Sequence, residues 1–143
     1  MDLEQLRLLA SDEHGLCVAS IVRQDGTPHA SVVNAGVLAH PRDGVDVVSF
    51  VTRGGSVKHR RLREHPHAAL TFRRGWQWAG IVGRVELIGP DDPASGIDST
   101  ELLRAVFVAA GGTHEDWDEY DRVMVAERRV AVLVRPDRIV GIG

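Results

Sequence analysis

The basic segment from Arg53 to Arg63 carries the side chains of this chain that are best suited to chemistry. It holds five cations, among them Lys58, the only lysine of a protein whose net charge is -3. A strand-like run precedes it, and two glycines lead into a helix expected to begin near Ser56. The N-terminus of a helix already carries partial positive charge and unpaired N–H groups. Lys58 in the first turn is therefore unfavourable for the helix unless an anion binds there.

A phosphate group fits the composition of this segment. The N–H groups, the helix dipole and a lysine can bind one phosphate together. Gly55 allows close approach of the backbone, and Ser56 can cap the helix or bond a phosphate oxygen. Lys58 and Arg61 share a helix face, and Arg53 can reach the same point. The spacing matches neither a P-loop nor a dinucleotide fingerprint, so a solvated basic helix end remains the alternative.

No other group of residues forms a recognisable catalytic set. His65 and His67 flank a proline without further ligands at metal-site spacing, so no metal is expected. There is no G-x-S-x-G motif of a serine hydrolase. The single cysteine, Cys17, excludes an internal disulfide, and its apolar neighbours predict a buried thiol. If the protein is an enzyme, a bound cofactor is expected to carry the chemistry.

Length and composition predict one globular domain over residues 1–143. No run approaches the roughly 18 apolar residues of a membrane span, and the acidic N-terminus does not resemble a signal peptide. A cytoplasmic protein that does not bind membranes is therefore expected. The pI of about 6.1 and the absence of a known motif argue against binding to nucleic acid.

Hydrophobic periodicity predicts a mainly β protein with six strands and peripheral helices. Asp25-Gly26 is a hairpin turn signal, and Gly80 and Gly83 predict a bend or bulge. Strands are expected at 16–22, 29–39, 45–52, 67–72, 76–89 and 129–141, and helices at 3–12, 56–65, 100–111 and 116–129. Their lengths and spacing favour a small closed or nearly closed barrel.

The aromatic residues are expected mainly to pack. Trp76 and Trp78 alternate along a predicted strand and would share a face, as core or as a platform for a planar ring, with core the default. Trp117 and Tyr120 have helical spacing, for which packing is again the default.

Four stretches of the chain, taken in order, resemble a known family. They are "DGTPHASVVNAGV", "VTRGGSVKHRRLREHPHAALTF", "WAGIVGRVELI" and "GGTHEDWDEYDRVMVAERRVAVLVRPDRIVG". They are similar to the split β-barrel flavin and deazaflavin oxidoreductases, the pyridoxamine-phosphate-oxidase-like superfamily. Within it, the sequence looks most like the actinobacterial branch that uses the deazaflavin coenzyme F420. The resemblance covers about residues 3–141.

The resemblance implies a six-stranded antiparallel split β-barrel that forms a homodimer, with cofactor sites at the subunit interface. It also implies which residues bind the cofactor. The second strand would lie along the ring system, the turn and helix start would hold the phosphate, and a strand tryptophan is similar to that of biliverdin-reducing members. In this chain these are Ser31, Val32, Val33 and Asn34, then Thr52, Arg53, Gly55, Ser56, Lys58 and Arg61, and finally Trp78. Arg60 and Arg63 are assigned to solvent.

The implied function is an F420-dependent oxidoreductase that transfers a hydride between F420 and an unsaturated small organic substrate, with no catalytic side chain identified. FMN-using members commonly carry an arginine and a lysine on the second strand, where this chain has residues such as His29, and this favours F420. Many deazaflavin members end in R-x-x-G-W, whereas Ile142 stands here, so a ring-stacking tryptophan is missing. The alternatives are an FMN-dependent oxidase or reductase, and a non-catalytic carrier of a deazaflavin, flavin or tetrapyrrole.

Overall fold

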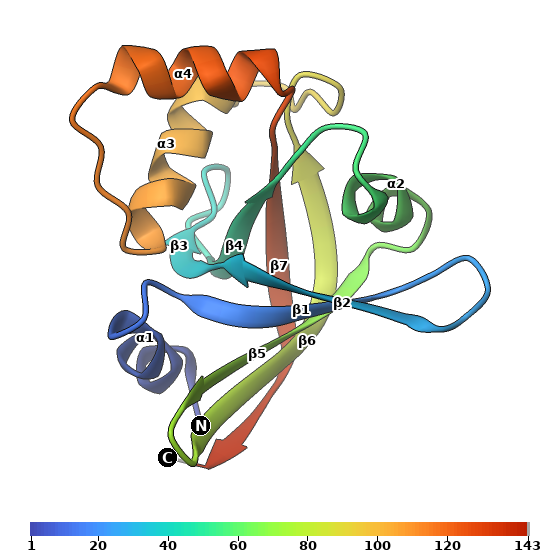
Figure 1. Ribbon diagram of the computed structural model, residues 1–143, viewed down its shortest axis with the longest axis vertical. Helices are drawn as coiled ribbons and strands as arrows, with labels where there is room; N and C mark the ends of the chain where they lie inside the picture. Colours follow the sequence, from blue (N-terminus) through green and yellow to red (C-terminus); the bar gives the residue numbers. More distant parts are fainter. Residues whose placement is uncertain (143) are drawn as a thin grey trace.

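The computed structural model describes residues 1–142 and shows one antiparallel sheet with helices around it (Figure 1). The strands are β1 Leu16–Val22, β2 Pro28–Asn34, β3 Gly36–Ala39, β4 Asp46–Thr52, β5 His67–Arg74, β6 Gln77–Ile88 and β7 Val130–Ile142. The helices are α1 Leu3–Ser11, α2 Val57–Glu64, α3 Ser99–Ala109 and α4 Trp117–Ala126. The strand order is β2-β1-β5-β6-β7-β4-β3. The mainly antiparallel β prediction is confirmed.

The prediction of six strands is wrong, because the expected strand 29–39 is two strands. β2 pairs with β1 at one edge of the sheet, and β3 pairs with β4 at the other edge. Ala35 lies between them and donates its N–H to the Gly15 carbonyl at 2.9 Å. At Gly36 a Cβ would overlap the backbone of Ala109, so the chain passes directly against the end of α3. The two edges are thus joined by the chain itself, and within residues 1–142 no hydrogen-bonded strand pair closes the sheet.

The other elements lie within a few residues of their expected positions. The chain turns at Gly26, whose φ of +87° suits glycine, and this forms the β1–β2 hairpin. The predicted irregularity is a register shift between Val82 and Gly83, where β6 pairs with β7. Gly83 is required there because a Cβ would overlap the carbonyl of Arg135.

The sheet carries two buried apolar clusters. The larger one packs α1 against the sheet and includes Phe50 and Phe72, while the smaller one lies under α3 and α4 and includes Tyr120. Cys17 is buried as expected, and burial raises the pKa of its thiol to about 12. The core interpretation of Trp76 is wrong, since its side chain lies in the β5–β6 turn and is 97% exposed. None of the helices within residues 1–142 is long and apolar enough to cross a membrane.

Candidate functional site

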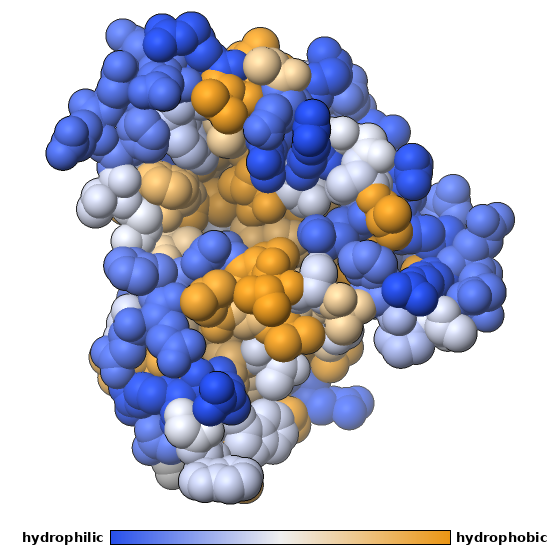
Figure 2. Space-filling model, viewed as in Figure 1, coloured by the Kyte–Doolittle hydropathy of each residue, from blue (hydrophilic) through white to orange (hydrophobic). Residues whose placement is uncertain are grey.

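A cleft of about 730 Å³ separates β2 from the α3–α4 pair. In Figure 2 the molecule is hollowed here, and apolar surface gathers inside the hollow. The lining residues are His14, Val32, Val33, Asn34, Val51, Thr52, Arg53, Ser56, Lys58, Val106, Phe107, Ala110, Gly112, Tyr120, Met124 and Arg129. The cleft therefore joins the second strand and the basic turn, which the sequence placed in one site, to two helices from the later part of the chain.

The basic turn contributes two cations to this cleft. Lys58 is half-buried, and its Nζ donates to Ser31 Oγ at 3.1 Å, which ties α2 to β2. Arg53 is exposed at the end of β4. Within residues 1–142 neither side chain has a carboxylate within ion-pair distance, whereas Arg61 and Arg63 each have one. Unneutralised positive charge is therefore concentrated at this end of the cleft.

The glycine turn uses most of its N–H groups inside the protein. Gly54 donates its N–H to the Glu127 carbonyl at 3.2 Å, and a Cβ at Gly54 would overlap the Arg128 carbonyl. Gly55, with a φ of +78°, donates its N–H to His59 Nδ1 at 2.9 Å. The first glycine is thus required by packing and the second by the turn itself.

Ser56 caps α2. Its Oγ accepts the N–H of His59 at 3.2 Å and lies 3.1 Å from Thr52 Oγ1. In the described part of the chain, the amides of Val57 and Lys58 in the first turn have no protein acceptor. These two N–H groups, the Ser56 hydroxyl and the two cations are donors that the basic turn offers to an anion.

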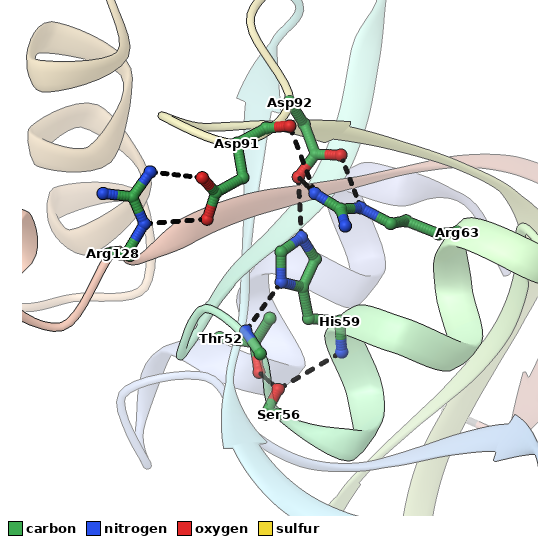
Figure 3. Close-up of polar contacts among 8 residues, drawn as sticks. Thr52, Ser56, His59, Arg63, Asp91, Asp92 and Arg128 are labelled. Atoms are coloured by element: carbon green, nitrogen blue, oxygen red, sulfur yellow. Dashed lines mark hydrogen bonds and ion pairs between the residues drawn. The ribbon is translucent and has the colours of Figure 1, made fainter.

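A network of ion pairs around the buried His59 supports the turn from behind (Figure 3). His59 Nε2 lies 2.6 Å from Asp92 Oδ2, and Arg63 Nε donates to Asp92 Oδ1 at 2.9 Å. Asp91 next to it pairs with Arg128. Burial alone would raise the pKa of Asp92, but the hydrogen bonds from Arg63 and His59 outweigh it and lower that pKa. The assignment of Arg63 to solvent is therefore wrong.

The structure brings most, but not all, of the predicted site residues together. Those lining the cleft are Val32, Val33, Asn34, Thr52, Arg53, Ser56 and Lys58. Ser31 contacts this set through Lys58, and Gly55, next to Ser56, bonds to His59 behind the turn. Arg61 does not line the cleft, because its Nε donates to the Val22 carbonyl at 3.0 Å and its Nη1 pairs with Glu64. Trp78 does not line the cleft either. It lies at the start of β6, where it pairs with Arg73 of β5 and Ile142 of β7.

The apolar wall of the cleft comes from α3 and α4 and was not predicted from the sequence. The ring of Phe107 lies 5.0 Å from that of Tyr120 and 6.0 Å from that of Trp117, between centroids. Tyr120 donates its hydroxyl to the Leu103 carbonyl at 3.0 Å, and burial raises its pKa to about 12. Helical spacing marked Trp117 and Tyr120 as packing residues, but only the fold shows which surface they support.

Two further lining residues are polar and were also missed. His14 Nδ1 lies 3.1 Å from the Gly111 carbonyl oxygen, and the His14 carbonyl accepts from Asn34 Nδ2 at 3.0 Å. Arg129 pairs with Glu127 at 3.0 Å. No group of three His, Cys, Asp or Glu side chains within residues 1–142 is arranged to hold a metal ion.

One face of the sheet carries a row of exposed, mainly apolar side chains. Val18 pairs with Val32 and with Thr71, and Thr71 pairs with Gly80, which pairs with Val140. These residues cross five neighbouring strands in one row, beside Val82 and Ile142. The side chains of Val18, Val32, Val82, Val140 and Ile142 are 40%, 66%, 49%, 46% and 63% exposed. We call this surface the outer face; a row of exposed apolar side chains of this kind favours contact with a partner.

Comparison with known proteins agrees with this architecture. The family model for pyridoxamine 5'-phosphate oxidase matches residues 3–140. A conserved hypothetical protein from Mycobacterium tuberculosis superposes with a TM-score of 0.72 at 18% identity, over 99% of this chain and 84% of its own. An F420 reductase superposes with a TM-score of 0.62 at 17% identity, over 92% of this chain and 93% of its own. An FMN-binding protein from Nostoc punctiforme superposes with a TM-score of 0.63 at 13% identity, over 96% of this chain and 81% of its own.

Proposed function

Because the chain belongs to the pyridoxamine 5'-phosphate oxidase family, whose fold binds flavins, we propose that its cleft binds a flavin-like cofactor. We propose further that the cofactor is the deazaflavin F420, as in the actinobacterial branch, and that the protein is a cytoplasmic oxidoreductase. It would transfer a hydride between F420 and an unsaturated small organic substrate. The likeness to an F420 reductase supports this choice at the level of the fold.

The observation that carries the proposal is the asymmetry of the cleft. Within residues 1–142, Arg53 and Lys58 have no carboxylate partner, and they lie next to first-turn N–H groups of α2 that have no protein acceptor. Phe107 and Tyr120 belong to the apolar wall on the α3–α4 side of the same cleft. A ligand that combines a phosphate with a planar ring system satisfies both surfaces. F420 and FMN are both ligands of this shape.

Each part of the cleft then has a defined task. Lys58, Ser56 and the first-turn amides bind the phosphate, and the backbone of Val32 to Asn34 aligns the ring system. The bound deazaflavin supplies the hydride chemistry. Phe107 and Tyr120 exclude water from the ring, and Tyr120 stays neutral because burial raises the pKa of its hydroxyl to about 12. No side chain is assigned as a nucleophile.

The outer face supports the proposed homodimer. A second copy packed on it would remove Val18, Val82 and Val140 from water. Trp78 pairs with Ile142 at the edge of the same face. Although Trp78 is remote from the cleft of its own chain, we propose that it reaches the cofactor bound by the partner subunit.

Two other functions use the same cleft. An FMN-dependent oxidase or reductase is favoured by the likeness to an FMN-binding protein. A non-catalytic carrier of a deazaflavin, flavin or tetrapyrrole would need no catalytic side chain, and none is identified in the cleft. Both functions predict binding of a cofactor, so the identity of the cofactor and its turnover separate the three.

The decisive experiment is a fluorescence titration of the purified protein with F420 and, separately, with FMN. F420 binding that is tighter than FMN binding supports the proposal. Tight FMN binding without F420 binding overturns it in favour of the flavin enzyme. If F420 binds, oxidation of reduced F420 is followed with a panel of unsaturated acceptors, and a bound cofactor that is never oxidised identifies a carrier.

A further inference from the structure

Two buried histidines of this chain have the same hydrogen-bond arrangement. His40 and His59 are each 2% exposed. His40 Nδ1 accepts the N–H of Arg42 at 3.1 Å, and its Nε2 lies 2.7 Å from Glu86 Oε1. His59 Nδ1 accepts the N–H of Gly55 at 2.9 Å, and its Nε2 lies 2.6 Å from Asp92. The His40 ring accepts from the β3–β4 turn, which lies away from the cleft. The His59 ring accepts from the turn that borders the cleft.

These contacts determine where the proton of His59 lies. A backbone N–H can only donate, so Nδ1 of His59 has to be the unprotonated acceptor. The remaining ring nitrogen, Nε2, then carries the hydrogen and donates it to the carboxylate of Asp92. The carboxylate accepts only, and Arg63 keeps it ionised through two further hydrogen bonds. Asp92 therefore selects the tautomer that can accept from Gly55.

The N–H of Gly55 has no other protein acceptor in residues 1–142. This bond closes the turn just before Ser56, whose hydroxyl in turn caps α2 at the N–H of His59. A hydrogen on Nδ1 would face the N–H of Gly55, donor against donor, and the bond would be lost. The tautomer of one buried ring thus controls the geometry of the residues that precede the free amides of Val57 and Lys58.

We propose that His59 is a positioning residue. Asp92 fixes its tautomer, the tautomer holds the N–H of Gly55, and the turn thereby presents the N-terminus of α2 and Lys58 to the anionic group of the ligand. The effect on the ligand depends on the proposed function, whereas the proton position and the closed turn do not. The charged groups around the ring are Asp92 and Arg63, with the pair of Asp91 and Arg128 beyond them.

The first test needs no ligand. Uniformly ¹⁵N-labelled protein is studied by NMR, which distinguishes a protonated from an unprotonated ring nitrogen and follows the exchange of backbone amides. We expect Nδ1 of His59 to be unprotonated and Nε2 to be protonated, and the Gly55 amide to exchange slowly with solvent. A protonated Nδ1, or a Gly55 amide that exchanges as fast as a free turn amide, would overturn the proposal.

The second test replaces the acceptor. In Asp92→Asn the side-chain NH₂ can donate to Nε2 of His59. The ring can then carry its hydrogen on Nδ1, and the hydrogen bond from the Gly55 N–H is lost. We expect Gly55 exchange at least tenfold faster and a dissociation constant for F420, or for FMN if that is the cofactor bound, about tenfold higher. The matched control is Glu86→Gln, which makes the same change at His40 and should leave Gly55 exchange and cofactor affinity unchanged.

The outcomes separate the two proposals. Equal loss of affinity in Asp92→Asn and Glu86→Gln, or none in either, refutes the positioning role even if the cofactor binds. If the wild-type protein binds neither F420 nor FMN, the proposed function fails, and Gly55 exchange in the two variants still decides whether His59 holds the turn. Should Asp92→Asn not fold, the ring and amide measurements on the wild-type protein decide.

Discussion

Replacement of Lys58 by alanine gives the most direct measure of the anion site. The Lys58 ammonium is half-buried, lines the cleft and donates to the neutral oxygen of Ser31, with no carboxylate to neutralise it within residues 1–142. Its charge is therefore free to serve a ligand. A hydrogen bond to a charged group contributes about 1.5–3 kcal/mol. We expect the dissociation constant of F420 to rise about 10- to 150-fold in Lys58→Ala.

The matched control is Arg60→Ala, two residues further along α2. It removes the same unit of charge, but Arg60 is exposed and does not line the cleft. Exposed charges act weakly at a distance because salt screens them over a Debye length of about 10 Å at 0.1 M. We expect a change in affinity of about twofold or less, corresponding to a few tenths of a kcal/mol.

Fluorescence titration at two salt concentrations measures both variants. Raised salt should abolish any small effect of Arg60→Ala and leave most of the effect of Lys58→Ala. Thermal unfolding followed by circular dichroism is needed beside it, because Lys58→Ala also removes the bond to Ser31, worth about 1 kcal/mol of stability. Unchanged affinity in Lys58→Ala, or an equal loss in both variants at high salt, would refute the anion site and leave a solvated basic helix end.

Three other predictions concern the fold and the assembly. Val82→Asp on the outer face should convert a dimer to a monomer in light scattering. Val108→Asp on α3, which is similarly exposed at 53%, should leave the dimer intact. An unchanged mass for Val82→Asp contradicts the proposed interface. Gly83→Ala should lower the free energy of unfolding in urea by about 1–3 kcal/mol, because its Cβ would overlap the Arg135 carbonyl, whereas Gly80→Ala meets only ordinary contacts and should cost less. Cys17 should resist iodoacetamide at pH 8 until the protein unfolds, because burial raises its pKa to about 12 and leaves almost no thiolate; rapid labelling of the native protein would contradict this.

The sequence predicted most strands because alternation and turn residues are local signals. The break at Ala35 was not predictable in this way, since Val33, Ala35 and Val37 continue the alternation of one strand without interruption. The break arises from tertiary structure: β2 belongs to one edge of the sheet and β3 to the other, and Gly36 passes against the end of α3. Only contacts distant in sequence distinguish one long strand from two.

The basic side of the cleft was predictable for a similar reason, because Arg53, Ser56 and Lys58 are close in sequence. Helical spacing also placed Arg61 beside Lys58, but a long side chain can turn away from its face, and Arg61 reaches the Val22 carbonyl instead. The apolar side was not predictable. The periodicity of α3 and α4 marks their apolar positions, yet it does not say that Phe107 faces β2 across a cleft.

The distribution of partners among the cations explains why an acidic protein concentrates positive charge at Arg53 to Arg63. Arg61 pairs with Glu64, and Arg63 pairs with Asp92 behind the turn. Arg53 and Lys58 receive no carboxylate from residues 1–142, although the chain has 20 acidic residues. A cation without a partner at a helix N-terminus destabilises the helix by about 0.3–1 kcal/mol. A bound anion reverses the sign of that contribution, so cations that lack a carboxylate partner within residues 1–142, as Arg53 and Lys58 do, are what a phosphate site requires.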